Sequence, residues 1–128
     1  MASAWSSVRG PSDLHVATAR AVLALATTVP GDVPVRTQGR CLRADHLLST
    51  LVVEAAVHHL DLEPVLPQPP HPDVLAEARR VLDALLGTPA PTEWDDVRYL
   101  RLGTGRATPT TDELTRLGEP AERLPLLG

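Results

Sequence analysis

Glu54 and His58 are the residues of this sequence whose types and spacing are best suited to chemistry. They lie in the apolar run LVVEAAVHHLD, residues 51–61. Residues four positions apart share one face of a helix, so a carboxylate oxygen and an imidazole nitrogen would converge there. Such oxygen and nitrogen ligands suit Zn²⁺ or another divalent first-row ion. The spacing therefore indicates a metal site.

A second interpretation of the same spacing is a Glu–His hydrogen bond or ion pair on a partly exposed helix face. An ionised glutamate among apolar neighbours is costly unless it meets a cation, a metal or a cleft, and this favours a partner for Glu54. Both interpretations stay open on spacing alone. Asp61 either orients His58 as a further carboxylate or helps to end the helix.

The other histidines are weaker candidates for ligands. His59 points about 140° away from Glu54 on a helix, so we expect it on another surface. His46 and His71 are expected to face solvent. His15 lies in the first turn of the first predicted helix, from which a bundle could bring it near the site.

Three helices with apolar periodicity are predicted at about residues 12–28, 43–62 and 73–86. Ser12 is expected to cap the first and Gly87 to end the third. The second is apolar on nearly every side, so its middle should be surrounded by protein. A loop, GDVPVRTQGR, is predicted between the first two, and the proline-rich EPVLPQPPHP is expected to be an extended connector.

The C-terminal extension, about residues 92–128, is predicted to be short and helical. Thr92 resembles the start of a helix that continues to about Leu102. Another turn or two is expected from Thr111, and the apolar end, Leu124 to Leu127, should pack back on the domain. The segment from Gly103 to Arg106 reads as a turn with an arginine available for an anion.

Composition favours an all-α fold in a single domain, because the 128-residue chain has no Phe or Ile and must build its core from Leu, Val and Ala. Residues 1–11 are expected to be disordered or extended, and residues 12–128 to form a single helical domain.

Charge and cysteine content narrow the function classes. The net charge is −4 and no basic block is present, so nucleic-acid binding is not expected. No apolar stretch is long enough to span a membrane, and Cys41 is the only cysteine, which excludes an internal disulfide. Because no neighbour activates it, Cys41 is expected to be a structural or surface thiol. We expect a cytoplasmic protein.

Three segments carry a resemblance to a known family: RCLRADHLLSTLVVEAAVHHLDL, DDVRYLRLGTGR and LGEPAERLPLLG. Together they resemble the mycothiol-dependent maleylpyruvate isomerase family, a branch of the DinB-like four-helix-bundle superfamily of thiol-dependent metalloenzymes. The resemblance covers roughly residues 12–128. It implies a partial DinB-like bundle in which Glu54 and His58 bind a divalent metal, typically zinc. It also implies an isomerase or transferase that uses mycothiol as thiol cosubstrate on a small electrophilic substrate.

The chain departs from that family near its start. The family takes a further histidine from an early helix, whereas residues 12–28 here resemble the third bundle helix. Two ligands are fewer than the three that protein supplies to catalytic zinc. A bundle without its first helices leaves apolar faces uncovered, so we expect a homodimer or a complementing helical partner. The alternative function is a non-catalytic helical module for dimerisation or partner binding.

Overall fold

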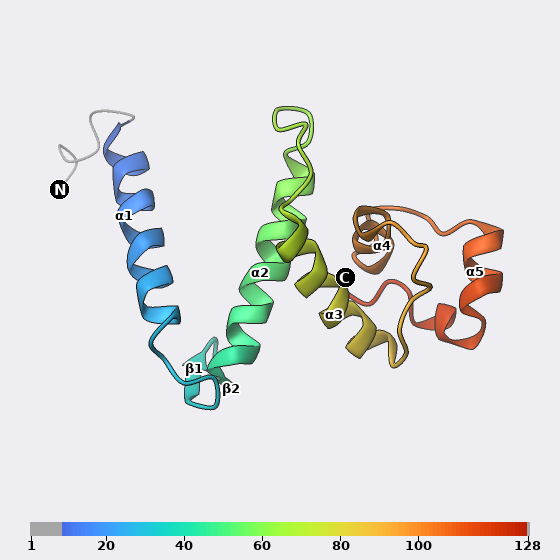
Figure 1. Cartoon of the computed structure of the whole chain (residues 1–128), viewed down its shortest axis with the longest axis horizontal. Coiled ribbons are helices and arrows are strands. Elements are labelled where there is room, and N and C mark those ends of the chain that lie inside the picture. Colours follow the sequence, from blue (N-terminus) through green and yellow to red (C-terminus); the bar gives the residue numbers. More distant parts are fainter. Residues whose placement is uncertain (1–8, 128) are drawn as a thin grey trace. The chain divides into compact units, whose positions relative to one another are not determined.

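The computed structural model describes residues 9–127, and these are mostly helical (Figure 1). Helix accounts for 59% of the chain and strand for 7%, which confirms the all-α class. The elements, in chain order, are α1 (Arg9–Ala26), β1 (Pro34–Thr37), β2 (Arg40–Arg43), α2 (Ala44–Asp61), α3 (Pro72–Leu86), α4 (Asp96–Gly103), α5 (Thr111–Leu117) and the 3₁₀-helix η2 (Glu119–Arg123).

The chain divides into two compact units, Met1–Leu48 and Ser49–Gly128, with the division inside α2. The first unit holds α1, the β-hairpin and the first residues of α2. The second holds the remainder of α2 and every later element. The single domain expected over residues 12–128 stays a prediction.

Helix α1 begins three residues earlier than the sequence indicates. It starts at Arg9, so Ser12 lies inside the helix and the prediction that Ser12 caps it is wrong. Pro11 explains the early start, because proline is tolerated in the first turn, where the backbone N–H has no helical partner. Residues 9–11 are thus helical and not extended. Residues 1–8 of the predicted disordered segment lie outside the described residues.

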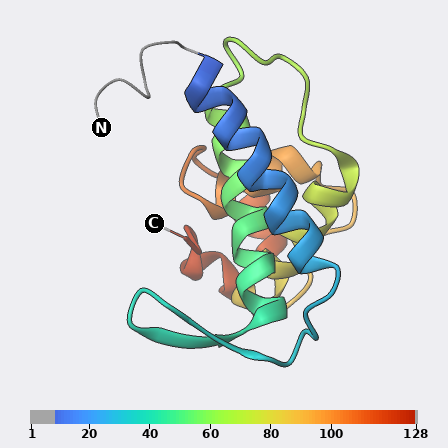
Figure 2. The ribbon, with the colours of Figure 1, turned by 90° about the vertical axis from the view of Figure 1, so that its left-hand side faces the viewer.

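The predicted loop before α2 contains an antiparallel β-hairpin, β1–β2, which leads directly into α2 (Figure 2). Its strands pair Val35 with Leu42 and Thr37 with Arg40. The two residues between the strands, Gln38 and Gly39, have φ angles of +46° and +77°. Two successive positive φ angles are typical of the tight hairpin turn whose twist matches that of the strands.

The core of the second unit lies between α2, α3 and α4. Its fully buried side chains are small aliphatic residues and one tyrosine, as expected for a chain without Phe or Ile. The cluster contains Val53, Ala56, Val57 and Leu60 of α2, Ala78, Leu82 and Leu86 of α3, Ala90, Tyr99 and Leu100, and Leu117 of α5.

Within the second unit, helix α2 is buried on the side that carries Ala56. Leu51 is 49% exposed and Ala55 is also exposed, whereas Ala56 is fully buried. The expectation that protein surrounds the middle of this helix stays a prediction for the side that carries Leu51 and Ala55. A helix that is apolar on most sides normally has neighbours on most sides.

The ends of α3 are specified locally. Pro72 occupies the start of the helix, and Nδ1 of His71 accepts a hydrogen bond from the backbone N–H of Asp73 at 3.3 Å. At the other end Gly87 adopts φ +83°, a left-handed conformation that favours glycine. The predicted C-terminal stop at Gly87 is confirmed.

Helix α4 begins later than the sequence indicates, at Asp96 instead of about Thr92. Asp95 is the N-cap: its carboxylate accepts a hydrogen bond from the N–H of Arg98 at 2.8 Å. This carboxylate satisfies a backbone donor that has no partner within the helix, so the helix starts after it. The prediction based on Thr92 is wrong.

The tail after α4 folds back onto that helix. The backbone N–H groups of Leu126 and Leu127 both donate to the carbonyl oxygen of Gly103, at 2.8 and 2.9 Å. This confirms that the apolar end packs on the rest of the protein. A Cβ atom at Gly103 would lie 2.8 Å from Cδ2 of Leu82, so a larger residue would have to displace this buried side chain.

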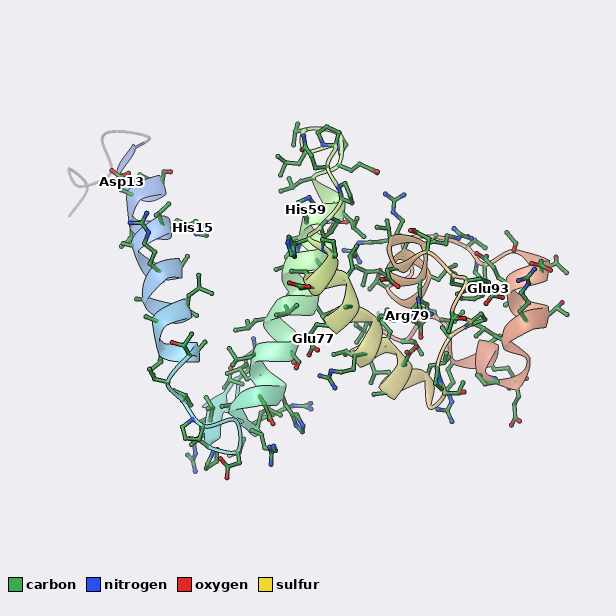
Figure 3. The ribbon with its side chains drawn as sticks, viewed as in Figure 1. Asp13, His15, His59, Glu77, Arg79 and Glu93 are labelled. Carbon is green, nitrogen blue, oxygen red and sulfur yellow. The ribbon has the colours of Figure 1, made fainter. Side chains whose placement is uncertain are left out.

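Arg79 joins α3 to the segment that leads into α4 (Figure 3). Its guanidinium donates to the carbonyl oxygens of Ala90, Pro91 and Trp94 and to the carboxylate of Asp96. It also lies 5.5 Å from the ring centroid of Tyr99. One side chain thus satisfies three backbone acceptors in a segment without regular structure.

Within residues 9–127, no helix combines the length and apolar character needed to cross a membrane.

Candidate metal and small-molecule site

Helix α2 brings Glu54 and His58 together as the sequence predicts. Oε2 of Glu54 and Nε2 of His58 are 3.6 Å apart, one helical turn from each other. Their side chains are 62% and 71% exposed, so neither is desolvated within one chain. The distance suits an ion pair when the imidazole is protonated, and two ligands for one cation when it is neutral.

Asp61 extends this polar stripe by less than one further turn. Its Oδ2 lies 3.7 Å from Nδ1 of His58. Both carboxylate oxygens accept hydrogen bonds from Arg106, at 2.7 Å from Nε and 2.8 Å from Nη2. Asp61 is therefore committed to Arg106, and it lies beside His58 as the orienting carboxylate would.

Charge interactions at the stripe favour the ionised forms of Asp61 and Arg106. Hydrogen bonding from Arg106 lowers the pKa of Asp61 below its usual value, and nearby His58 acts in the same direction. Asp61 in turn raises the pKa of Arg106, to which the charge of Glu54 also contributes. The stripe thus carries two carboxylates, those of Glu54 and Asp61, and one guanidinium cation, that of Arg106.

A hollow of about 450 Å³ lies beside the Glu54–His58 pair. This volume is within the range of small-molecule sites. Its lining combines polar and apolar residues and consists of Val53, Glu54, Val57, His58, Thr104, Arg106, Leu126 and Leu127. The hydroxyl of Thr104 donates to the carbonyl oxygen of Leu100 at 2.7 Å, so its hydrogen is engaged within the helix end.

The donor set of the second unit is too small for a complete catalytic zinc site. Among residues 9–127, no group of three or more His, Cys, Asp or Glu side chains is placed to hold a metal ion. Glu54 and His58 supply two ligands, and both oxygens of Asp61 are taken by Arg106. Catalytic zinc sites have three protein ligands and an open position. The second unit therefore supplies two of the three protein ligands of a catalytic zinc site.

The other histidines of the second unit, His59 and His71, are engaged elsewhere. His59 forms a hydrogen bond of 2.7 Å with the carbonyl oxygen of Gln68, on another surface, as predicted. His71 caps α3, and His46 lies next to Asp45, with side chains that are 70% and 68% exposed. His15 lies on α1, in the other unit.

Arg106 is the site residue whose partner sequence reasoning missed. The sequence predicts a turn with an arginine available for an anion, and the anion is Asp61, 45 residues earlier in the chain. No local spacing relates the two residues. The only signal is that Arg106 follows a predicted helix end, where a long side chain can reach a neighbouring helix.

A second hollow, of about 400 Å³, lies at the β-hairpin and is lined by Arg36, Thr37, Gln38, Gly39, Arg40 and Cys41. Cys41 is exposed, in agreement with the predicted surface thiol. No carboxylate or imidazole lines this hollow, so it contains neither a general base nor a pair of metal ligands.

Comparison with known proteins found no match: no family model, no curated protein and no solved structure matches this chain. The fold and the site define a mostly helical protein with a Glu–His pair beside a small-molecule-sized hollow.

Proposed function

We propose that this chain is a mycothiol-dependent, metal-binding protein of the isomerase or transferase kind that acts on a small electrophilic substrate. The observation that supports the proposal is the approach of Glu54 to His58, 3.6 Å apart beside a hollow of about 450 Å³. The motifs around these residues resemble the mycothiol-dependent maleylpyruvate isomerase family, whose members pair a divalent metal with a thiol.

The hollow suits a small molecule that has both polar and apolar groups. Val53 and Val57 of α2 and Leu126 of the tail supply apolar contact, while Glu54 and His58 supply polar atoms. The tail is held by two hydrogen bonds to Gly103, so this wall is part of the folded structure. Apolar walls with a few placed polar groups are typical of small-molecule sites.

Zinc titration tests the proposed ligands. Chelator-treated protein should bind Zn²⁺ in isothermal titration calorimetry, and Glu54→Ala or His58→Ala should weaken binding by at least about tenfold. Matched controls are Glu122→Ala and His46→Ala, which remove a glutamate and a histidine away from the pair and should leave the affinity unchanged. Equal affinity in all five proteins would remove the metal assignment.

Turnover tests the chemistry. Maleylpyruvate should be consumed only when mycothiol is present, and consumption should stop on addition of a chelator and return with Zn²⁺. The side chains of Glu54 and His58 are exposed, so circular dichroism should show the variants folded. No thiol-dependent consumption by folded, zinc-loaded protein would contradict the enzymatic proposal.

A second candidate function is a non-catalytic helical module for association. It is favoured by α1, whose large apolar side chains are exposed: Leu14, Val16, Val22, Leu23 and Leu25 are each at least 44% accessible. Exposed apolar side chains gathered on one helix mark a surface for another protein. This function predicts that dimerisation persists in the double variant Glu54→Ala/His58→Ala and that no turnover occurs. Chelator-sensitive turnover would contradict it.

A further inference from the structure

The β-hairpin of the first unit carries two cations that have no acidic partner. Residues 34–43 include three arginines and no acidic residue. Arg43 is paired with Asp45, whose carboxylate oxygens lie 3.0 Å from its Nε and 2.6 Å from its Nη2. Arg36 and Arg40 form neither a side-chain hydrogen bond nor an ion pair in the part of the chain that the structure describes. Two guanidinium charges at the hairpin therefore lack a counter-charge.

The two units also differ in charge. Met1–Leu48 has five arginines and three aspartates, whereas Ser49–Gly128 has seven arginines and thirteen acidic residues. The net charge of −4 already favours solubility, so free arginines are not needed for that purpose. An excess of positive charge confined to one part of an acidic chain indicates an anionic partner.

The two free arginines line the same hollow, of about 400 Å³, at the hairpin turn. Arg36 precedes the turn and Arg40 follows it, so the two long side chains reach the hollow from different strands. Thr37 and Gln38 also line it, and their side chains have no hydrogen-bond partner among the described residues. A hydroxyl and an amide add further donors. The hollow therefore offers several donors and no carboxylate.

We infer that this hollow binds a phosphate monoester of a small polar molecule, with the phosphate group between Arg36 and Arg40. The inference is independent of the proposed function, because Glu54 and His58 belong to the other unit. Two arginines in a hollow suit one anionic group, whereas nucleic acids and anionic membranes are bound by broad rows of positive charge.

The chemistry of a phosphate monoester fits this lining. The paired N–H donors of a guanidinium match two phosphate oxygens. A phosphate monoester carries nearly two negative charges at neutral pH, which balances the charges of Arg36 and Arg40. A hollow of about 400 Å³ is within the range of small-molecule sites, so it has room for an organic part beside the phosphate. Thr37 and Gln38 can form hydrogen bonds with hydroxyl groups of that part.

Isothermal titration calorimetry of the full chain tests the inference with ribose 5-phosphate, glucose 6-phosphate and glycerol 3-phosphate. At least one of these esters should bind at least about tenfold more tightly than the ribose, glucose or glycerol from which it derives. Inorganic phosphate should bind more weakly than that ester, because it lacks the organic part. No binding of any ester, or equal binding of inorganic phosphate, would overturn the inference.

Arginine variants locate the phosphate group. Arg36→Gln and Arg40→Gln should each weaken binding of the ester by at least about tenfold. Both side chains are exposed, so circular dichroism should show the variants folded. The matched control is Arg20→Gln, which removes an exposed arginine from α1 of the same unit and should leave the affinity unchanged. Native affinity in Arg36→Gln and Arg40→Gln would overturn the inference.

Cys41 reports whether the hollow is occupied. It is the only cysteine, it is exposed, and it pairs with Arg36 in the strand register and lines the same hollow. Alkylation by iodoacetamide, followed by mass spectrometry, should slow by up to about tenfold when the ester is present at about nine times its dissociation constant. The double variant Glu54→Ala/His58→Ala should show the same protection, because the first unit alone forms the hollow. Binding that leaves the alkylation rate unchanged would place the ester elsewhere and overturn the inference.

Discussion

Arg106 and Asp61 form a two-point ion pair that ties the turn after α4 to the last residue of α2. Nε and Nη2 of the guanidinium lie 2.7 and 2.8 Å from the two carboxylate oxygens. Paired N–H donors matched to two carboxylate oxygens hold both groups in one orientation. The pair therefore fixes one edge of the hollow beside Glu54 and His58.

Asp61→Asn should lower the free energy of unfolding only modestly, because both partners are partly exposed and solvent screens the charges. Urea denaturation followed by circular dichroism measures the change. The matched control is Glu63→Gln, which removes the charge of the carboxylate that accepts a single hydrogen bond from Arg101 at 2.7 Å. Glu63→Gln should lower the free energy of unfolding by less than Asp61→Asn does. Equal losses of stability would contradict a special role for the two-point geometry.

Arg79→Met should be more damaging than any change at the exposed ion pairs. It leaves the carbonyl oxygens of Ala90, Pro91 and Trp94 without their donor in a partly buried position. The Arg79 side chain is only 19% exposed. Loss of a partner for several partly buried polar groups should cost about 2–4 kcal/mol in the free energy of unfolding.

The neighbouring arginine provides the control for that experiment. Arg80 is 61% exposed and bonds Glu77 on the same helix. Arg80→Met should cost less than about 1 kcal/mol, as expected for a surface ion pair. Chemical denaturation of both variants under the same conditions gives the comparison, and similar losses would show that the contacts of Arg79 contribute little.

The helices could be predicted from the sequence because each has apolar periodicity and most have local end signals. The three main helices fall within three residues of their predicted bounds. The hairpin could not be predicted, since its turn is formed by Gln38 and Gly39, and glutamine is not a residue typical of positive φ. Its strands are only four residues long, too short for alternation to stand out.

Only those residues of the site that lie close together in the sequence could be predicted to meet. Glu54 and His58 are four residues apart, so helix geometry alone brings them together. Arg106 reaches Asp61 across 45 residues, and that contact depends on how α4 packs against the rest of its unit. The exposure of Leu51 was also unpredictable, because the pattern shows that a helix has several apolar sides and not which of them a neighbour covers.

Gly103→Ala should destabilise the second unit, because the new Cβ atom would lie 2.8 Å from Cδ2 of the fully buried Leu82. Overpacking of this kind costs about 1–3 kcal/mol. Thermal and urea unfolding measure the loss. In a Leu82→Ala background the same substitution should cost at least about 0.5 kcal/mol less, since its obstacle is gone. Additive effects would show that the contact does not limit the approach of α4.

Glu113 should make stability depend on pH in the acid range. Arg98 donates to both of its carboxylate oxygens, at 2.8 and 2.7 Å, and this lowers the pKa of Glu113 from about 4.5 to about 2. A carboxylate with a lowered folded-state pKa contributes stability that is complete above the unfolded pKa. That stability is lost as the pH falls toward the folded value. The relevant window is therefore from about pH 4.5 down to about pH 2.

Glu113→Gln isolates this effect, because glutamine can still accept the hydrogen bond from the backbone N–H of Thr110 that closes the capping box of α5. The variant should be less stable than the native chain by about 1 kcal/mol at pH 7. The difference should shrink as the pH falls from 4.5 to 2, measured by urea denaturation at several pH values. Glu119→Gln, at an exposed glutamate, should change the stability at pH 7 by less than about 0.5 kcal/mol. A difference for Glu113→Gln that persists undiminished at pH 2 would show that the charge pair with Arg98 is not its source.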